Sequence, residues 1–383
     1  MSSPVITAPH TKWARAIGIA VGASLIVAVV VLAFLWPSIT SSIKSFPIAV
    51  TGDATQVSSF TEALDKNAEG RFDVTTLDSR SEAVDRIESR DIYGAVVLGQ
   101  KPEVLTASAG GTVQTQVMGQ LQSQLQMQVN SLTAAGVQAA VAKTNAAAEA
   151  GQLPPAQAAQ IIEKALSTTP ATVKLTDVVP LASTDSRGVG FAAASFPMVL
   201  GGMLGGILIS VLVAGVWRRF AAILAYSVIA GFGLTAILQP WFGILQGDFL
   251  VNGAAMALTL LGTGALIVGA TAVFGRIGIA VGSVITMFIG NPISAATQPL
   301  QFLPAPWGAI GQFFVPGAST TLLRDLSYFP DANALQSWLV LAGWALVGVV
   351  LMFVGHFRSQ EVVHVESAIE KPMTGSAPVI ATA

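Results

Sequence analysis

GIAVGSVITMFIGNPISAATQPLQFLPAPWGAIGQFFVPG, residues 278–317, decides how the second half of this chain folds. The stretch carries no charged residue, and five prolines follow Gly290 within it. No continuous helix accommodates them, because each proline ring removes an amide donor and clashes with the preceding turn. Non-helical backbone this apolar is tolerated near a bilayer only where protein or a water-filled cavity satisfies its amides and carbonyls. We therefore predict a membrane helix that ends near Gly290, followed by a re-entrant segment over 291–316.

Composition places the chain among integral membrane proteins. Hydrophobic residues make up 52% of its 383 residues, charged residues only 10%, and the mean hydropathy is +0.67. That is too apolar for a soluble protein. The formal net charge of −2 and the lack of a basic stripe give no electrostatic basis for a nucleic-acid partner. Because the chain has no cysteine, disulfides and cysteine-ligated metal sites are excluded.

Six apolar segments are long enough to cross a hydrocarbon core about 30 Å thick. The first lacks the small-residue cleavage site of a signal peptide, which favours an uncleaved anchor. The six segments are 16–36, 191–216, 220–245, 249–274, 277–296 and 335–357. The predicted fold is an α-helical polytopic membrane protein with six transmembrane helices, of which the fifth is broken. An extracytoplasmic α/β domain is inserted between the first two helices.

The distribution of positive charge predicts the orientation. Basic residues flank the spans on one side, and acidic residues with a single arginine, Arg324, lie on the other. The positive-inside rule then puts both termini in the cytoplasm of a cell membrane protein. The predicted parts are a cytoplasmic N-terminus (1–15), transmembrane helix 1 (16–36), the extracytoplasmic domain (37–190), a five-helix membrane domain (191–358) and a cytoplasmic, disordered tail (359–383).

Within the extracytoplasmic domain, strand and helix patterns alternate. Runs at 46–51, 72–77 and 94–98 are typical of strands, and the helices between them begin with box-like caps at Asp53 and Ser79. Two β-α-β units in succession predict a small, partly parallel sheet.

A long helix is predicted at 112–150, with a narrow apolar stripe between glutamines. A second helix, 155–166, completes a hairpin that projects from the sheet. The stripe packs on its own domain or on a neighbouring helix, or else binds a separate ligand.

Motifs for catalysis are absent from the sequence. No G-x-x-x-x-G-K-[ST] phosphate loop, H-E-x-x-H pair or G-x-S-x-G elbow occurs. The glycines at 231–236 imitate a dinucleotide fingerprint but lie inside a membrane helix with no strand before them. We therefore predict no enzyme activity, no cofactor and no metal.

The predicted spans carry no Asp, Glu, Lys or Arg, which argues against a self-powered proton antiporter. They do carry glycines at four-residue spacing, notably Gly201 with Gly205 and Gly278 with Gly282. Such faces let helices approach closely, either inside a bundle or across a homodimer.

Polar side chains in the broken segment are the candidate site. Asn291 and Ser294 are predicted to sit in a partly hydrated pocket along a translocation path, with Gln298 and Gln301 near its outer mouth, because an unpartnered buried amide costs about 1 to 3 kcal/mol. The alternative is an apolar loop packed on top of the bundle. Arg324 could pair with Asp325, meet a lipid headgroup or remain solvated. The residues assigned to this region are Asn291, Pro292, Ser294, Gln298, Gln301, Pro304, Pro316 and Arg324.

The same region resembles a known family. G-N-P-I-S-A-A, L-P-x-x-W-G-x-I-G-Q, V-P-G-A and L-L-R-D-L-S-Y-F follow one anchor helix, a large domain and clustered spans. This order resembles the type-2 ABC exporter permeases, and among them the actinobacterial YhgE/Pip (phage-infection-protein-like) branch. The matching positions are Gly290, Asn291, Pro292, Ser294, Pro299, Leu303, Pro304, Pro316, Gly317, Leu323, Arg324 and Tyr328, which are structural landmarks.

The resemblance implies a membrane component of an exporter for lipid-like or amphipathic substrates, without its own ATPase. Its expected partners are membrane lipids and a separate ATP-binding subunit or another envelope transporter. One departure from the family is the loop at 217–220, which is too short to offer an ATPase subunit a large binding surface. The second reading is therefore a non-transporting scaffold or receptor in cell-envelope assembly.

Overall fold

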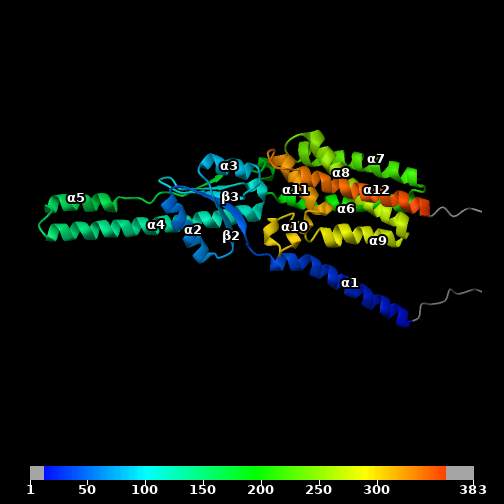
Figure 1. Ribbon diagram of the computed structural model, residues 1–383, viewed down its shortest axis with the longest axis horizontal. Helices are drawn as coiled ribbons and strands as arrows, with labels where there is room; N and C mark the ends of the chain where they lie inside the picture. The colour runs from blue at the N-terminus through cyan, green and yellow to red at the C-terminus, as the bar shows by residue number, and fades with distance from the viewer. Residues whose placement is uncertain (1–12, 359–383) are drawn as a thin grey trace, which may run out of the picture.

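The computed structural model describes residues 13–358 (Figure 1). The predicted tail at 359–383 and most of the predicted N-terminal segment, residues 1–12, lie outside the described residues. Two parts follow one another along the long axis of the molecule. An α/β domain with a projecting helical hairpin lies at one end, and a bundle of long helices lies at the other (Figure 1).

The α/β domain contains a five-stranded sheet in the order β2-β1-β3-β4-β5. The β1–β2, β1–β3 and β4–β5 pairs are parallel, whereas β3 and β4 pair antiparallel. The strands are β1 (Phe46–Thr51), β2 (Phe72–Thr76), β3 (Gly94–Val97), β4 (Glu103–Thr106) and β5 (Lys174–Asp177). The partly parallel sheet expected from the alternating pattern is therefore present.

The two faces of the sheet pack against different partners, as the alternation of strand side chains requires. Ile48 and Val50 belong to a core with α2 (Ala54–Asn67) and the first part of α4 (Thr112–Glu149). Ala49 belongs to a second core that includes α3 (Arg80–Glu88) and continues into the helical bundle. The domain and the bundle therefore share one apolar core.

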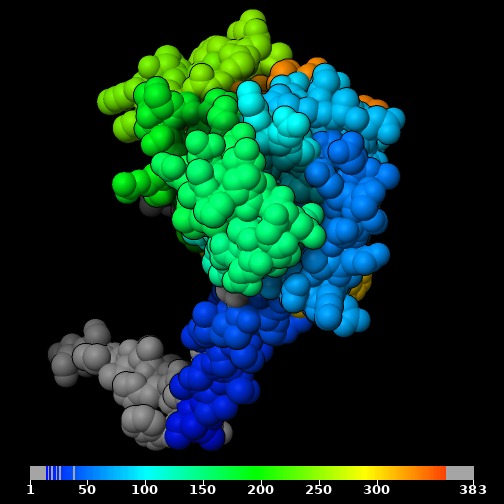
Figure 2. Space-filling model, turned by 90° about the vertical axis from the view of Figure 1, so that its left-hand side faces the viewer, coloured from blue at the N-terminus to red at the C-terminus, as the bar shows by residue number. Residues whose placement is uncertain are grey.

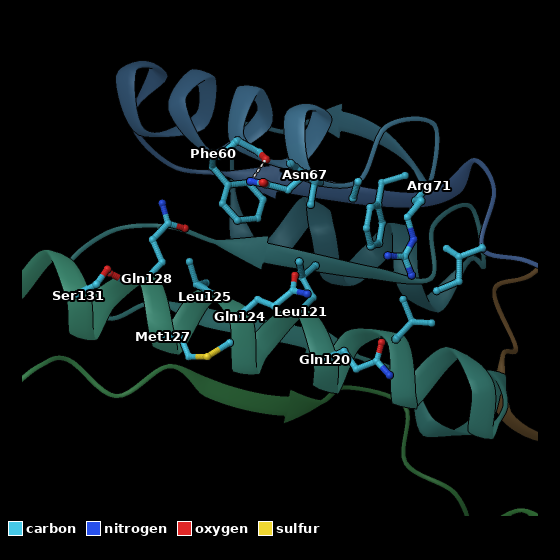
Figure 3. Close-up of a pocket in the computed structure, with 16 residues that line it drawn as sticks. Phe60, Asn67, Arg71, Gln120, Leu121, Gln124, Leu125, Met127, Gln128 and Ser131 are labelled. Carbon is cyan, nitrogen blue, oxygen red and sulfur yellow. Dashed lines mark hydrogen bonds between the residues drawn. The ribbon is translucent and has the colours of Figure 1, made fainter.

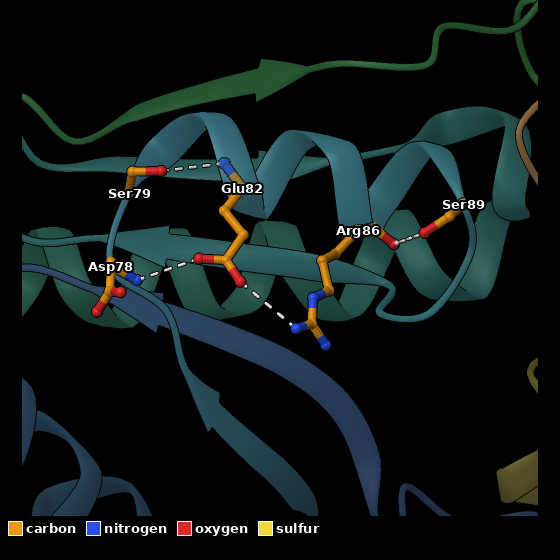
Figure 4. Close-up of polar contacts among 5 residues, drawn as sticks. All are labelled: Asp78, Ser79, Glu82, Arg86 and Ser89. Atoms are coloured by element: carbon orange, nitrogen blue, oxygen red, sulfur yellow. Dashed lines mark hydrogen bonds and ion pairs between the residues drawn. The ribbon is translucent and has the colours of Figure 1, made fainter.

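One of the two predicted helix caps forms. At the start of α3, Ser79 Oγ accepts from the amide of Glu82 at 3.1 Å, and the Glu82 carboxylate accepts from the amide of Asp78 at 3.4 Å (Figure 4). The box predicted at Asp53 is wrong. Asp53 holds the N-cap position of α2 with extended backbone, but its side chain makes no capping hydrogen bond.

The predicted hairpin consists of α4 and α5 (Pro155–Leu166), and it extends away from the bundle (Figure 1). The first half of the apolar stripe on α4, including Val117, Leu121 and Leu125, is buried in the core of its own domain. Leu132, further along the same stripe, is 65% exposed. The stripe therefore stabilises the domain at its base and is uncovered towards the tip.

Five helices have the length and apolar character to cross a membrane, which fits a helical polytopic membrane protein. They are α1 (Trp13–Thr40), α6 (Val189–Leu212), α7 (Val216–Ala236, continued by a π-helical turn to Trp241), α8 (Phe249–Phe274) and α12 (Leu335–Arg358). Helix α8 packs against α6, α7 and α12 and is the most buried of the five.

The predicted fifth span, 277–296, is not confirmed as a membrane-crossing helix, so five of the six predicted spans are present. Helix α9 (Ile277–Ser283) and the π-helical turn Val284–Gly290 together hold only 7 + 7 = 14 residues. About 20 residues are needed to cross a bilayer. The helix ends at Gly290 because Pro292 cannot continue it and also disfavours helical backbone at Asn291.

The loop expected at 217–220 lies elsewhere. Val216 already begins α7, and the connection from α6 is made by residues 213–215, where Gly215 has a φ of 87°. Arg219 in the first turn of α7 donates to the carbonyls of Val213 and Ser210, at 2.7 and 3.0 Å. The arginine thus satisfies the C-terminal end of α6. Arg218 and Arg219 both lie inside α7, because the helix begins four residues before the predicted span, 220–245.

Helix α1 diverges from the other helices (Figure 1) and extends beyond the outline of the molecule in Figure 2. Only 6% of the residues in its most apolar stretch, Ala20–Pro37, are buried, against 67% for the corresponding stretch of α8. Its contacts with the bundle involve the π-helical turn that ends at Gly290. Along the rest of its described length, α1 exposes aliphatic side chains such as Leu25 and Leu32.

Candidate functional site at the junction of domain and bundle

The segment that the sequence predicts to be re-entrant (291–316, hereafter the re-entrant segment) and the helix that follows it are built from short helices whose starts are set by proline. A 3-10 turn covers Leu300–Phe302, helix α10 covers Trp307–Gly311 and helix α11 covers Val315–Tyr328. Pro299 and Pro306 immediately precede the first two, and Pro316 lies in the first turn of the third. Proline suits these positions because the first amides of a helix have no intrahelical partner. The carbonyl of Pro304 accepts from the amide of Trp307, at 2.9 Å.

A hollow of about 290 Å³ lies where this segment meets α1 and α6. Helix α1 contributes Phe34 and Pro37, and α6 contributes three residues that include Ala192 and Phe196. Four of the predicted site residues line the same hollow, namely Asn291, Pro292, Ser294 and Gln298. The structure therefore brings half of the predicted set together beside the most loosely packed helix.

The polar groups of the hollow are only partly satisfied by the protein. Ser294 Oγ donates to the carbonyl of Asn291 at 2.7 Å, and Gln298 Oε1 accepts from Ser41 Oγ at 2.8 Å. Within residues 13–358, no hydrogen bond involves the carboxamide of Asn291, which is half-buried. A hollow with mixed polar and apolar walls and a free amide can hold either water or the polar part of an amphipathic molecule.

Gln301 lies apart from the hollow and contacts the α/β domain instead. Its Oε1 accepts from the hydroxyl of Tyr93 at 3.0 Å. The next residue, Phe302, inserts its ring into the domain core, with its centroid 5.7 Å from that of Phe46. The turn at 300–302 thus fastens the re-entrant segment to the sheet.

Arg324 is buried in α11, outside the five membrane-spanning candidates, so the alternative of a solvated side chain is wrong. It donates to the carbonyl of Ala296 at 3.0 Å, and its guanidinium carbon lies 5.0 Å from the ring centroid of Phe191. Burial lowers the pKa of Arg324 to about 10. The arginine ties the re-entrant segment to α11 and α6.

Asp325 pairs with an arginine of the α/β domain and not with Arg324. The partner is Arg90, in the turn after α3, and both side chains are mostly buried. Arg90 also stacks over Phe329, with its guanidinium carbon 5.3 Å from the ring centroid. Burial raises the pKa of Asp325, and the charge of Arg90 opposes that shift. This ion pair is the most buried of those between the described residues.

Sequence reasoning missed Arg90 and Tyr93 as parts of the junction. Both follow α3 in a stretch that offers no motif, and their partners are 235 and 208 positions away. No local signal in the sequence marks them, since the positive φ of Arg90, 62°, is a property of the folded backbone.

Three of the four predicted packing glycines lie at close helix contacts. A Cβ on Gly205 would lie 2.1 Å from the Tyr226 ring, and one on Gly278 would lie 2.1 Å from the carbonyl of Ala270. Gly282 is similarly close to Ile267, while Gly201 leaves ordinary contact distances.

Two further observations bear on chemistry at this junction. Among residues 13–358, no cluster of three or more His, Asp or Glu could hold a metal ion. No protein-family model, curated protein or solved structure matches the chain. The fold and the site define a class, an α/β domain docked on a bundle of apolar helices through a broken, proline-rich segment.

Proposed function

We propose that this protein is the membrane component of an exporter for lipid-like or amphipathic substrates, with the α/β domain on the outer face of the cell membrane. The observation that supports the proposal is the hollow between α1, α6 and the re-entrant segment. Part of its lining is apolar, including Phe34 and Phe196, and suits the apolar part of an amphiphile, while the Asn291 carboxamide suits a polar head.

Access to the hollow from the bilayer is part of the proposal. Helix α1 forms one wall through Phe34 and Pro37. It packs weakly, because only 6% of the residues in its stretch Ala20–Pro37 are buried. A lipid-like molecule would enter sideways between α1 and α6, where only weak packing has to be displaced. Discontinuous helices of this kind line the substrate sites of many transporters.

The energy for export would come from a partner. The sequence holds no phosphate-binding loop, so a separate ATP-binding subunit or another envelope transporter would supply it. The short connection at 213–215 offers such a subunit little surface, which supports the second candidate function, a non-transporting envelope scaffold. The scaffold reading is also favoured by the projecting hairpin, whose exposed apolar residues include Leu132 and Leu166.

A lipid analysis of cells with and without the gene separates the two functions. For the exporter, deletion should deplete at least one amphiphile from the outer envelope fraction and enrich it in the cytoplasmic membrane, and complementation should reverse both changes. Unchanged lipid distributions, together with loss of an envelope protein complex, would favour the scaffold.

A further inference from the structure

A second hollow, larger than the first, lies in the α/β domain between α2 and α4 (Figure 3). Its volume is about 600 Å³, and 16 residues line it. Small-molecule sites in proteins typically enclose about 300 to 1,000 Å³. It lies over the core that α2 and α4 form with one face of the sheet, whereas the core shared with the bundle lies on the opposite face. We call it the α2–α4 groove.

The α2–α4 groove has an apolar floor and an amide rim. Large apolar side chains form the floor, among them Phe60, Leu64, Leu121 and Leu125. Glutamines one turn apart on α4 form one rim, namely Gln120, Gln124 and Gln128. From Val117 to Ser131 the groove follows α4 over 14 helical steps, or about 21 Å at 1.5 Å per step. This shape suits one extended hydrocarbon chain.

Charge in the α2–α4 groove is one-sided. Arg71 is the only charged residue among the lining residues, and none of them is acidic. Within the described chain, Arg71 takes part in no ion pair. It lies at the end where the linker from α1 enters the domain, because its carbonyl accepts from the amide of Phe46 at 2.9 Å. A ligand with a negative head at that end would complement the groove.

The linker at 41–45 connects the α2–α4 groove to the hollow at the junction. Ile43 lines the groove, while Ser41 donates to Gln298, which lines the hollow. Residues two positions apart in one short linker thus contact the groove and a lining residue of the hollow.

We propose that the α2–α4 groove binds a single-chain anionic amphiphile of the fatty-acid type, with its chain along α4 and its carboxylate at Arg71. This inference rests on the proposed function, whose substrate class it names. Binding and export are nevertheless separate measurements.

The test uses the full-length protein in nanodiscs made of zwitterionic phospholipid, with a photoactivatable long-chain fatty acid as probe. After illumination, mass spectrometry should locate the label on peptides from α2 and α4. Ala63→Trp, which fills the groove from α2, should reduce that labelling about tenfold, whereas Ala134→Trp on an exposed part of α4 should not. Arg71→Glu should reduce it by a similar factor, and Lys66→Glu, outside the groove, should not.

Competition identifies the head and the number of chains. An excess of unlabelled fatty acid should abolish the groove label, and the alkylamine of equal length should not. Equal labelling in Ala63→Trp and Ala134→Trp, equal competition by the amine, or better competition by a two-chain anionic phospholipid would overturn the proposal. If the groove is labelled but deletion of the gene leaves the lipid distribution unchanged, the result would contradict export and support fatty-acid binding in the groove. If deletion alters the lipid distribution but the groove is not labelled, the result would support export and contradict fatty-acid binding in the groove.

Discussion

Arg90 and Asp325 form a buried ion pair that joins the α/β domain to helix α11 of the bundle. Breaking a buried pair from one side leaves an uncompensated charge, which typically costs about 3 to 5 kcal/mol. We expect Arg90→Ala to lower the free energy of unfolding by about 3 kcal/mol, because Arg90 retains some solvent contact. Denaturant titration in detergent micelles measures the change.

The matched control for this prediction is Arg86→Ala. Arg86 pairs with Glu82 on the same helix, and both side chains are more than a third exposed. Its loss should cost no more than about 0.5 kcal/mol. If both substitutions cost the same, the Arg90–Asp325 pair does not hold the domain on the bundle.

Glycine packing gives a second prediction. Gly205→Val should destabilise the bundle by about 1 to 3 kcal/mol, because its Cβ would overlap the ring of Tyr226. Gly22→Val on α1 should be tolerated, since no atom lies within 4 Å of a Cβ there. The melting temperatures of the two purified variants test this prediction. An equal fall in melting temperature in both variants would contradict it and would show that α1 packs against a partner at Gly22.

Orientation can be tested with single cysteines, because the chain has none of its own. Ser123→Cys and Asp331→Cys lie on the domain side of the bundle, and Ala214→Cys lies in the connection at the opposite end. With the domain outside the cell, an impermeant maleimide should label the first two in intact cells and the third only after lysis. The reverse pattern would invert the proposed topology.

A pH dependence follows from Glu103. The hydrogen bond from Arg80, at 2.7 Å, lowers the pKa of the Glu103 carboxyl, although burial opposes it. A carboxyl with a depressed folded-state pKa contributes stability above its unfolded pKa of about 4.5 and loses it as pH falls through the folded value. The contribution should be below about 1 kcal/mol, because Arg80 is half exposed. Melts from pH 7 to pH 3 should show a smaller acid-dependent loss in Glu103→Gln than in the unmodified protein.

The elements that sequence reasoning predicted are those with local signals. Alternation in strands β1 to β4 and the helical stripe of α4 depend on neighbouring residues, and the cap at Ser79 depends on a residue three positions away. The end of the fifth helix near Gly290 was predicted from Pro292 and is confirmed. The span itself was drawn too long, to residue 296, because hydropathy continues past Gly290.

The junction could not be predicted in the same way. Asn291, Ser294 and Gln298 were found because polar residues stand out in an apolar stretch, but nothing local separates Gln298, in the hollow, from Gln301, bound to Tyr93. The pairing of Asp325 with Arg90, instead of with its neighbour Arg324, depends on how the domain docks. Such contacts join segments more than 200 positions apart and leave no periodic trace in the sequence.

Passage of a lipid-like molecule through the hollow between α1 and α6 can be blocked by a side chain that fills the hollow. Ala192 lines the hollow, and its neighbour Ala193 is exposed and does not. In deletion cells, Ala192→Trp at normal protein level should fail to restore the amphiphile to the outer envelope fraction, whereas Ala193→Trp should restore it. Full restoration by Ala192→Trp would contradict the account.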